Sequence, residues 1–293
     1  MEIPEGIRSI GSAAFADNYI TAVNLPNFLE SIGSEAFAGN DIHELSLPVG
    51  VRLGPRSFAS NGFLSSVTIP DDARIYGGNP FCDCPELTSL KEVKVNLKTS
   101  QYIKNGGIGL VNSEGMLIMP LEDLPDENVQ PVKSIGAYCY AYNWDVDAAG
   151  LNGLDLSSID IYAFFWAINL TSVTFGRDNV KYIGTNAFNH CDIRTLDLPS
   201  SLTEINGRAF AFNENLSSVN IPANISSIDE GAFLSCTALK GVYMSGDYTV
   251  APNIAENAFE GDPHYLIRLK DKATYDLFRA SPQLSSLNMT YGQ

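Results

Sequence analysis

The stretch Ile228-Asp229-Glu230-Gly231-Ala232-Phe233-Leu234-Ser235-Cys236 decides the fold of this chain, because versions of it recur along most of the sequence. Its aromatic residue sets the register. The equivalent positions hold Phe15, Phe37, Phe58, Phe81, Tyr140, Phe164, Phe188, Phe210, Phe233 and Phe259. They are separated by 21 to 26 residues, apart from the 59 between Phe81 and Tyr140. A repeat of this length predicts a solenoid, in which each coil packs only on its neighbours.

Two short strands are predicted in each repeat, one on either side of the aromatic residue. An apolar residue lies five positions before it, as Ile32 lies before Phe37. After it comes a pattern of the form L-x-x-V-x-L, as at Leu216, Val219 and Ile221, whose last two apolar residues have the spacing of two typical of a strand. Proline follows this strand in five repeats and would end it, since proline has no N–H to donate. Stacked coils would align such strands into parallel sheets.

The third residue after the aromatic is short and polar in most repeats. The position holds Asn18, Asn40, Asn61, Cys84, Asn143, Ala167, Cys191, Asn213, Cys236 and Asp262. A short polar side chain can satisfy backbone groups where a coil bends, and cysteine is a small, weak donor that fits the same place. The pattern therefore predicts an asparagine and cysteine ladder that runs through the coils.

These positions together resemble the BspA-type leucine-rich repeats. The match to I-G-x-x-A-F-x-x-[N/C]-x-x-L-x-x-V-x-[L/I]-P is cleanest at residues 32–40 and 228–236 and covers nearly the whole chain outside residues 91–131. The resemblance implies a leucine-rich-repeat solenoid, a right-handed superhelix of mostly parallel β structure with short 3-10 or α turns. It also implies a bacterial or protist surface protein that acts as an adhesin or interaction scaffold, secreted or held at the cell surface.

One solenoid is expected over residues 1–293, with N-terminal repeats at 1–90 and C-terminal repeats at 132–266. The insertion at 91–131 reads as a β-hairpin around residues 112–115, followed by an acidic loop at 122–128. Residues 267–293 form a C-terminal cap, in which Asp271 precedes a helix. Residues 144–150 lengthen one repeat. The chain opens inside a repeat and shows no leader, which we interpret as trimming.

The charge of the chain excludes some classes of partner. Acidic residues outnumber basic residues 34 to 18, which gives a formal net charge of −16. An acidic surface repels phosphate backbones and anionic headgroups, so no nucleic acid partner is expected. No apolar run is long enough to span a bilayer. The apolar fraction of 45% is sufficient for a packed core.

The sequence predicts no catalytic residue, no cofactor and no metal site. His190, Cys191 and Asp192 are adjacent, but the register turns Cys191 inward and His190 outward, which a catalytic arrangement does not allow. Three of the five cysteines occupy the ladder, in coils too far apart for a disulfide. We therefore expect binding rather than catalysis.

The residue two positions after the repeat aromatic gives the candidate binding site. Most repeats hold a small or polar residue there, which indicates exposure. Four successive repeats hold Tyr142, Trp166, His190 and Phe212 instead. Stacked coils would place these four in one column, which we call the predicted aromatic column, unless the segment 144–150 folds over it. An exposed aromatic patch is typical of a surface that contacts a partner.

A second, weaker set lies on the sheet. The outward strand positions include Asp155, Thr174, Asp197, Asn220 and Tyr243. Asp155 and Asp197 flank Thr174, but carboxylates two coils apart are usually only solvated. The sequence favours a non-enzymatic module that binds a protein partner, and the alternative is a glycan-binding surface protein that uses the aromatic column.

Overall fold

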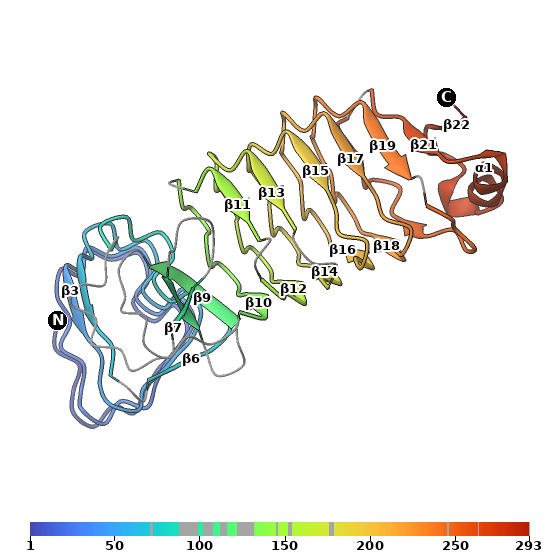
Figure 1. Ribbon diagram of the computed structural model, residues 1–293. Helices are drawn as coiled ribbons and strands as arrows, with labels where there is room; N and C mark the ends of the chain where they lie inside the picture. Colours follow the sequence, from blue (N-terminus) through green and yellow to red (C-terminus); the bar gives the residue numbers. More distant parts are fainter. Residues whose placement is uncertain are drawn as a thin grey trace. The chain divides into compact units, whose positions relative to one another are not determined.

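The computed structural model describes residues 1–70, 73–87, 99–101, 108–111, 116–121, 132–144, 146–151, 154–175, 179–244, 246–262 and 264–292. The chain forms two compact units, Met1–Asn143 and Trp144–Gln293. Each unit is a stack of coils joined by parallel strands (Figure 1). The expected repeat solenoid is therefore present in both units, while one continuous solenoid over 1–293 stays a prediction. The acidic loop at 122–128 lies outside the described residues.

The first unit builds three groups of strands. β1, β2, β4 and β6 pair in parallel, β3 pairs with β5, and β7 to β10 form the third group. Their bounds are β1 Ser9–Ile10, β2 Ser31–Ile32, β3 Glu44–Ser46, β4 Arg52–Leu53, β5 Ser66–Thr68, β6 Arg74–Ile75, β7 Thr99–Gln101, β8 Ile108–Val111, β9 Met116–Leu121 and β10 Ser134–Ile135. In the insertion, β8 and β9 pair antiparallel around residues 112–115, and β9 then pairs in parallel with β10.

The second unit has two parallel sheets that alternate along the chain. One runs in the order β11-β13-β15-β17-β19-β21-β22, and the other contains β12, β14, β16, β18 and β20. Their bounds are β11 Ala148–Gly150, β12 Ser158–Ile159, β13 Ser172–Thr174, β14 Tyr182–Ile183, β15 Thr195–Asp197, β16 Glu204–Ile205, β17 Ser218–Asn220, β18 Ser227–Ile228, β19 Gly241–Met244, β20 Asn253–Ile254, β21 Ile267–Leu269, β22 Met289–Tyr291, with helix α1 Lys272–Arg279 and 3-10 helix η1 Pro282–Leu284. Figure 1 shows the larger sheet as a row of arrows that ends at α1.

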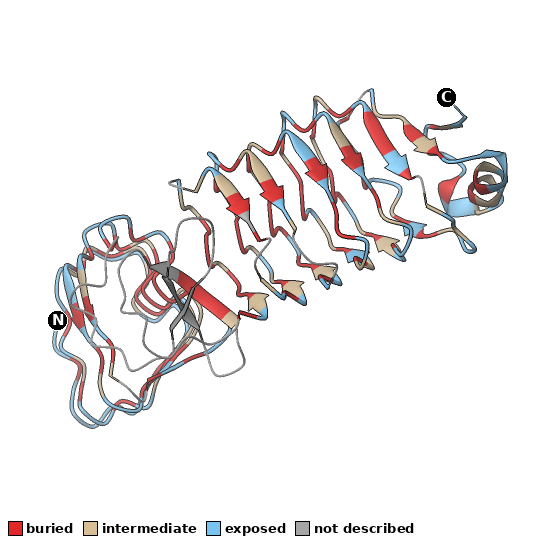
Figure 2. Ribbon diagram, viewed as in Figure 1, coloured by how far each residue is buried: buried red, intermediate tan, exposed pale blue. Residues whose placement is uncertain are grey.

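The strands bury alternate residues, as their pattern predicts. In β13, β15 and β17 the middle residues Val173, Leu196 and Val219 are buried, and the residues that follow them are exposed. Figure 2 shows the same alternation as red flanked by tan and pale blue. The strands are only two to four residues long in this unit because each coil must turn again within about 23 residues.

The repeat aromatics form the core of each unit. Phe188 has no exposed surface, and its ring stacks on Phe164 at 4.9 Å and on Phe210 at 5.3 Å between centroids. The stack continues through Phe233 to Phe259. A second stack runs through Phe15, Phe37, Phe58 and Phe81. The register taken from these residues is confirmed.

The predicted ladder is also confirmed. The amide of Asn213 is fully buried and donates to the carbonyl oxygens of Phe188 and Phe210 at 2.8 and 2.9 Å. The thiols of Cys191 and Cys236 take the same place and point at the carbonyls of Phe164 and Phe210, at 3.1 and 3.2 Å. These three ladder residues thus satisfy carbonyl groups of the preceding coil, and Asn213 also satisfies one of its own coil.

The turns around the aromatics are not the short 3-10 or α turns that we expected. Positive φ angles bracket each aromatic in most coils, as at Asn186 (56°) and His190 (57°) around Phe188. A helical turn needs negative φ at every residue, so these segments cannot be helical. Their backbone instead forms a third ladder between coils, in which Phe188 donates to the carbonyl of Ala209 and His190 to that of Ala211.

The C-terminal cap begins where the sequence predicts. The Asp271 side chain accepts a hydrogen bond from the backbone N–H of Thr274 at 2.8 Å and caps α1. Phe278 of this helix is fully buried and meets the ring of Tyr248 edge-on at 5.3 Å. The helix therefore closes the end of the unit over its last strands.

Candidate functional site

Three members of the predicted aromatic column stack on one another in the second unit. His190 lies between Trp166 and Phe212, with ring centroids 4.5 Å and 4.3 Å apart and interplanar angles of 10° and 20°. Trp166 is 40% exposed, while His190 and Phe212 are half-buried. We call these three residues the three-ring stack.

Two further rings extend the three-ring stack sideways. Phe165 meets Trp166 and His190 edge-on at 6.5 and 6.4 Å, and Tyr162 meets Phe165 edge-on at 5.1 Å. Phe165 could be suspected from its place beside Trp166. Tyr162 could not, because the position two residues before the repeat aromatic holds alanine, glutamate, arginine, asparagine or glycine in every other coil except that of Tyr138. The result is a continuous patch of five aromatic side chains.

The backbone under the three-ring stack is left-handed. Trp166, His190 and Phe212 have φ angles of 57°, 57° and 58°. Glycine, asparagine and aspartate adopt this conformation readily, whereas a bulky residue loses about 1 kcal/mol in it. Other coils hold residues such as Asp17 and Gly39 at the same position, with the same sign of φ. Backbone strain of this kind tends to collect at functional surfaces.

The segment 144–150 leaves the three-ring stack open. Ala148–Gly150 is strand β11 and pairs with β13, so part of the presumed irregular segment is a regular strand of the larger sheet. Trp144 is itself 60% exposed, and its carbonyl accepts a hydrogen bond from the Asn169 side chain. The exposure of Trp166 shows that this segment does not bury the indole ring.

Tyr142, the fourth residue of the predicted column, belongs to the first unit. It is half-buried and has a φ of 58°, as the other three have. Burial raises the pKa of its phenol, and the neighbouring Arg56 guanidinium opposes this shift. Its place in one column with the other three residues stays a prediction.

His190 is the one titratable ring in the three-ring stack. Burial lowers its pKa, and the nearby Glu214 carboxylate partly opposes this shift. Its Nδ1 contacts the side-chain oxygen of Asn189. A lowered pKa keeps the ring uncharged at neutral pH, which suits contact with apolar groups.

The secondary sheet-face candidates are placed differently from the prediction in one respect. Gly150, not Asp155, pairs with Thr174, because β11 ends before Asp155 is reached. The Asp155 carboxylate instead accepts a hydrogen bond from Asn179. Asp155 is therefore removed from the sheet-face row.

Asp197, Asn220 and Tyr243 of that row are in register. Asp197 pairs with Asn220, Asn220 with Tyr243, and Tyr243 with Arg268 across neighbouring strands. The Asn220 amide donates to the Asp197 carboxylate. The Arg268 guanidinium lies 5.4 Å from the centre of the Tyr243 ring. The side chains of this row therefore contact one another or Arg268, which leaves fewer of their polar groups free to bind a partner.

The residues with catalytic potential are placed as the register predicts. Cys191 is buried, and burial raises its thiol pKa, while the neighbouring His190 lies in the outward stack. All five cysteines are buried and carry free thiols. Within the described ranges, no group of three or more histidine, cysteine or acidic side chains is arranged to hold a metal ion. None of the described helices has the length and apolarity to cross a membrane.

Sequence comparison identifies the family. The model of the BspA type leucine rich repeat region matches residues 1–103 and 133–265, in six copies. The chain belongs to the BspA-type leucine-rich-repeat family. Comparison with curated protein sequences gives no match.

Three solved structures of bacterial proteins resemble this BspA-type chain. The pneumococcal vaccine antigen PcpA is 20% identical with a TM-score of 0.69, covering 100% of this chain and 78% of its own. A leucine rich cell surface protein from Faecalibacterium prausnitzii is 23% identical with a TM-score of 0.54, and 94% of this chain spans 61% of its length. A leucine-rich repeat protein from Eubacterium ventriosum is 21% identical with a TM-score of 0.53, over 89% and 82% of the two chains. At these identities the likeness shows the shared fold.

Proposed function

We propose that this chain is a non-enzymatic protein-interaction module of a secreted or cell-surface protein, and that it binds its partner through the three-ring stack. The single observation that carries this proposal is the stack itself. Three aromatic side chains occupy a surface position that most other coils fill with small or polar residues, and they remain partly exposed. Tryptophan and tyrosine residues on such patches supply much of the binding energy at protein interfaces.

The geometry of the rings favours a protein partner over a glycan. A sugar ring binds an aromatic side chain by lying against an open ring face. Both faces of His190 are covered, by Trp166 and by Phe212. A sugar therefore cannot lie against His190, whereas the ring edges of the three-ring stack can pack against apolar side chains and backbone carbonyls of another protein.

The cell-surface location is supported by the family and by two printed names. One similar structure is described as a cell surface protein and another as a vaccine antigen. Vaccine antigens are typically proteins exposed at the cell surface. The acidic net charge of −16 is consistent with a partner that is neither nucleic acid nor anionic membrane.

The test is a paired capture experiment with the full chain. One variant carries Trp166→Ser, His190→Ser and Phe212→Ser, because Ser60 and Ser235 occupy the same left-handed position in other coils. The control is Trp144→Ser, which removes an exposed indole outside the three-ring stack. Each immobilised protein is incubated with a mixture of extracellular proteins, and captured proteins are identified and then titrated as purified proteins.

The proposal predicts a partner that binds the native chain and the control alike, with at least a tenfold weaker affinity for the triple variant. Capture that is equal for all three proteins would contradict it, as would repeated failure to retain any protein. Glycan binding is the alternative function, and it is tested by glycan array. Array signal that disappears in Trp166→Ala without a change in the melting temperature would favour it over protein binding.

A further inference from the structure

The last coil of the second unit leaves a hydrogen-bonding edge open. In the coil before it, the N–H groups of Phe233 and Ser235 donate to the carbonyls of Ala258 and Glu260, at 2.8 and 2.7 Å. The equivalent groups of the last coil are the N–H groups of Phe259 and Gly261. Within the part of the chain that the structure describes, neither has a hydrogen-bond acceptor. These two N–H groups therefore lie where a further coil would supply carbonyl oxygens to accept from them.

The core at this edge is already closed. The ring of Tyr265 stacks on Phe259 at 4.9 Å and takes the place that the aromatic residue of a next coil would have. Helix α1 contacts β21 and β22, and η1 contacts β20, so the cap lies against both sheets. Glu260 and Gly261 of this turn stay exposed, while Phe259 is 3% exposed and lines the cavity described next.

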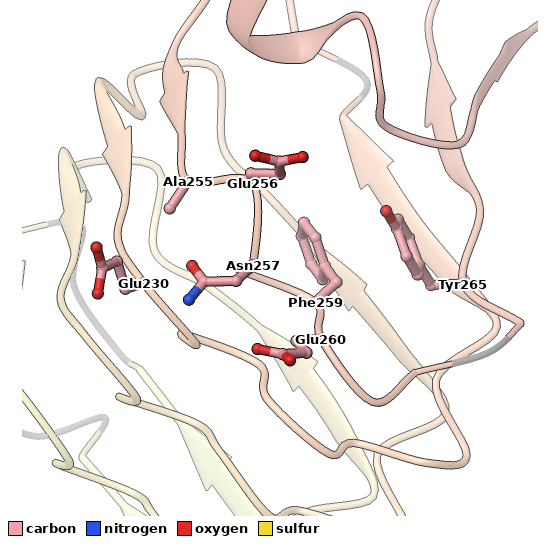
Figure 3. Close-up of a pocket in the computed structure, with 7 residues that line it drawn as sticks. All are labelled: Glu230, Ala255, Glu256, Asn257, Phe259, Glu260 and Tyr265. Carbon is pink, nitrogen blue, oxygen red and sulfur yellow. The ribbon is translucent and has the colours of Figure 1, made fainter.

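A cavity of about 680 Å³ lies beside this turn (Figure 3). It is lined by Glu230, Ala255, Glu256, Asn257, Phe259, Glu260 and Tyr265. Figure 3 shows the rings of Phe259 and Tyr265 side by side, with the three carboxylates around them. Glu230, Glu256 and Glu260 are exposed, and none has an ion-pair partner among the described residues.

These features select one class of ligand. Unpaired N–H groups attract acceptors, but three nearby carboxylates repel an anion. An uncharged acceptor flanked by positive charges satisfies both requirements. Backbone carbonyls of a polypeptide with lysine or arginine side chains fit this description, because the carbonyls accept from the edge while the cations face the carboxylates.

We propose that the cavity at the last coil binds a basic polypeptide segment of a partner protein, which adds to the open edge as the turn of a further coil would. The register fixes the spacing of the basic residues. Glu256 lies three residues before Phe259, and Glu260 lies one residue after it. A segment that continues the stack would carry its basic residues four positions apart. This site is independent of the three-ring stack, so either can fail without the other.

The probe is the capped peptide acetyl-Ala-Lys-Gly-Ala-Ala-Lys-Gly-amide. Its glycines occupy the left-handed positions, and alanine replaces the repeat aromatic because Tyr265 already fills that place. The matched control peptide carries glutamate at both lysine positions. Binding to the full chain is followed by NMR, through the amide resonances of Phe259 and Gly261, and by their hydrogen exchange.

The lysine peptide should shift both amide resonances and slow their exchange, while the glutamate peptide should do neither. A triple variant that keeps the side-chain shape carries Glu230→Gln, Glu256→Gln and Glu260→Gln. Its affinity for the lysine peptide should be about tenfold weaker, because the exposed ion pairs between lysine and glutamate are lost. The triple serine variant of the three-ring stack should bind the peptide normally. Equal binding of both peptides, no binding of the lysine peptide, or shifts confined to other residues would overturn the proposal.

Discussion

Replacing Asp262 by asparagine should stabilise the protein, and the gain should grow with pH. Asp262 occupies the ladder position of the last coil, where Asn213 donates to two carbonyl oxygens. It is only 4% exposed, and neither of its carboxylate oxygens has a hydrogen-bond partner among the described residues. An ionised carboxylate has no proton to give to the carbonyls that line this position in other coils.

The size of the effect follows from the pKa. Burial raises the pKa of Asp262 from 3.8 to about 7. The folded protein therefore binds this proton more tightly than the unfolded chain does. The contribution of Asp262 to stability is therefore most favourable below pH 4 and is lost as the pH rises from about 4 to about 7. Each pH unit within that window costs about 1.4 kcal/mol, so the full loss is about 4 kcal/mol.

Asparagine does not ionise, so Asp262→Asn removes this loss. The free energy of unfolding should rise by about 2 kcal/mol at pH 5.5 and by about 4 kcal/mol at pH 8. Urea unfolding followed by circular dichroism measures both values, and pH 5.5 keeps the chain clear of its pI near 4.4. Glu260→Gln is the matched control, because it removes the same charge from an exposed side chain of the same coil.

A stability difference between Asp262→Asn and the native chain that is independent of pH would refute this reasoning. So would an equal gain from Glu260→Gln, since the effect would then reflect the net charge of the chain rather than the buried carboxyl.

Two further predictions concern the packing of the coils. Phe188→Ala should lower the free energy of unfolding by about 3 to 5 kcal/mol, because the ring is fully buried between two others; a thermal melt with no loss would mean that the register is wrong. Gly184→Ala should cost about 1 to 3 kcal/mol, because its methyl group would lie 2.6 Å from backbone atoms of Asp160 and Ile161 in the preceding coil; a melt unchanged from that of Gly207→Ala, where the nearest atom is 3.5 Å away, would contradict this.

The sequence predicts the coil interior well because the same residue types recur at the interior positions of successive repeats. Phe188 and Asn213 recur in equivalent form about every 23 residues, so their burial and hydrogen bonds follow from the register alone. The cap at Asp271 is predictable for a different reason, since capping depends on residues within one helical turn.

Features that depend on one coil are harder to predict. Asp155 sits in a strand-like pattern, but β11 uses Ala148–Gly150, whose small residues carry no apolar signal. The positive φ angles in the turns could not be predicted either. Bulky residues such as Trp166 and Tyr162 occupy these positions, so the glycine that usually indicates a left-handed conformation is absent. The alignment of the three aromatic residues in one column could be predicted from the register, but the ring stacking that covers both faces of His190 depends on side-chain geometry.

The emission of Trp166 tests the proposed interaction surface most directly. The chain has two tryptophans, so Trp144→Phe leaves Trp166 as the only indole. A partner isolated by the capture experiment is then titrated into this variant. Because the indole is 40% exposed, a partner that covers the three-ring stack should exclude water and shift its emission to shorter wavelength, with the same midpoint as binding. Saturated binding with unchanged Trp166 emission would contradict the proposal.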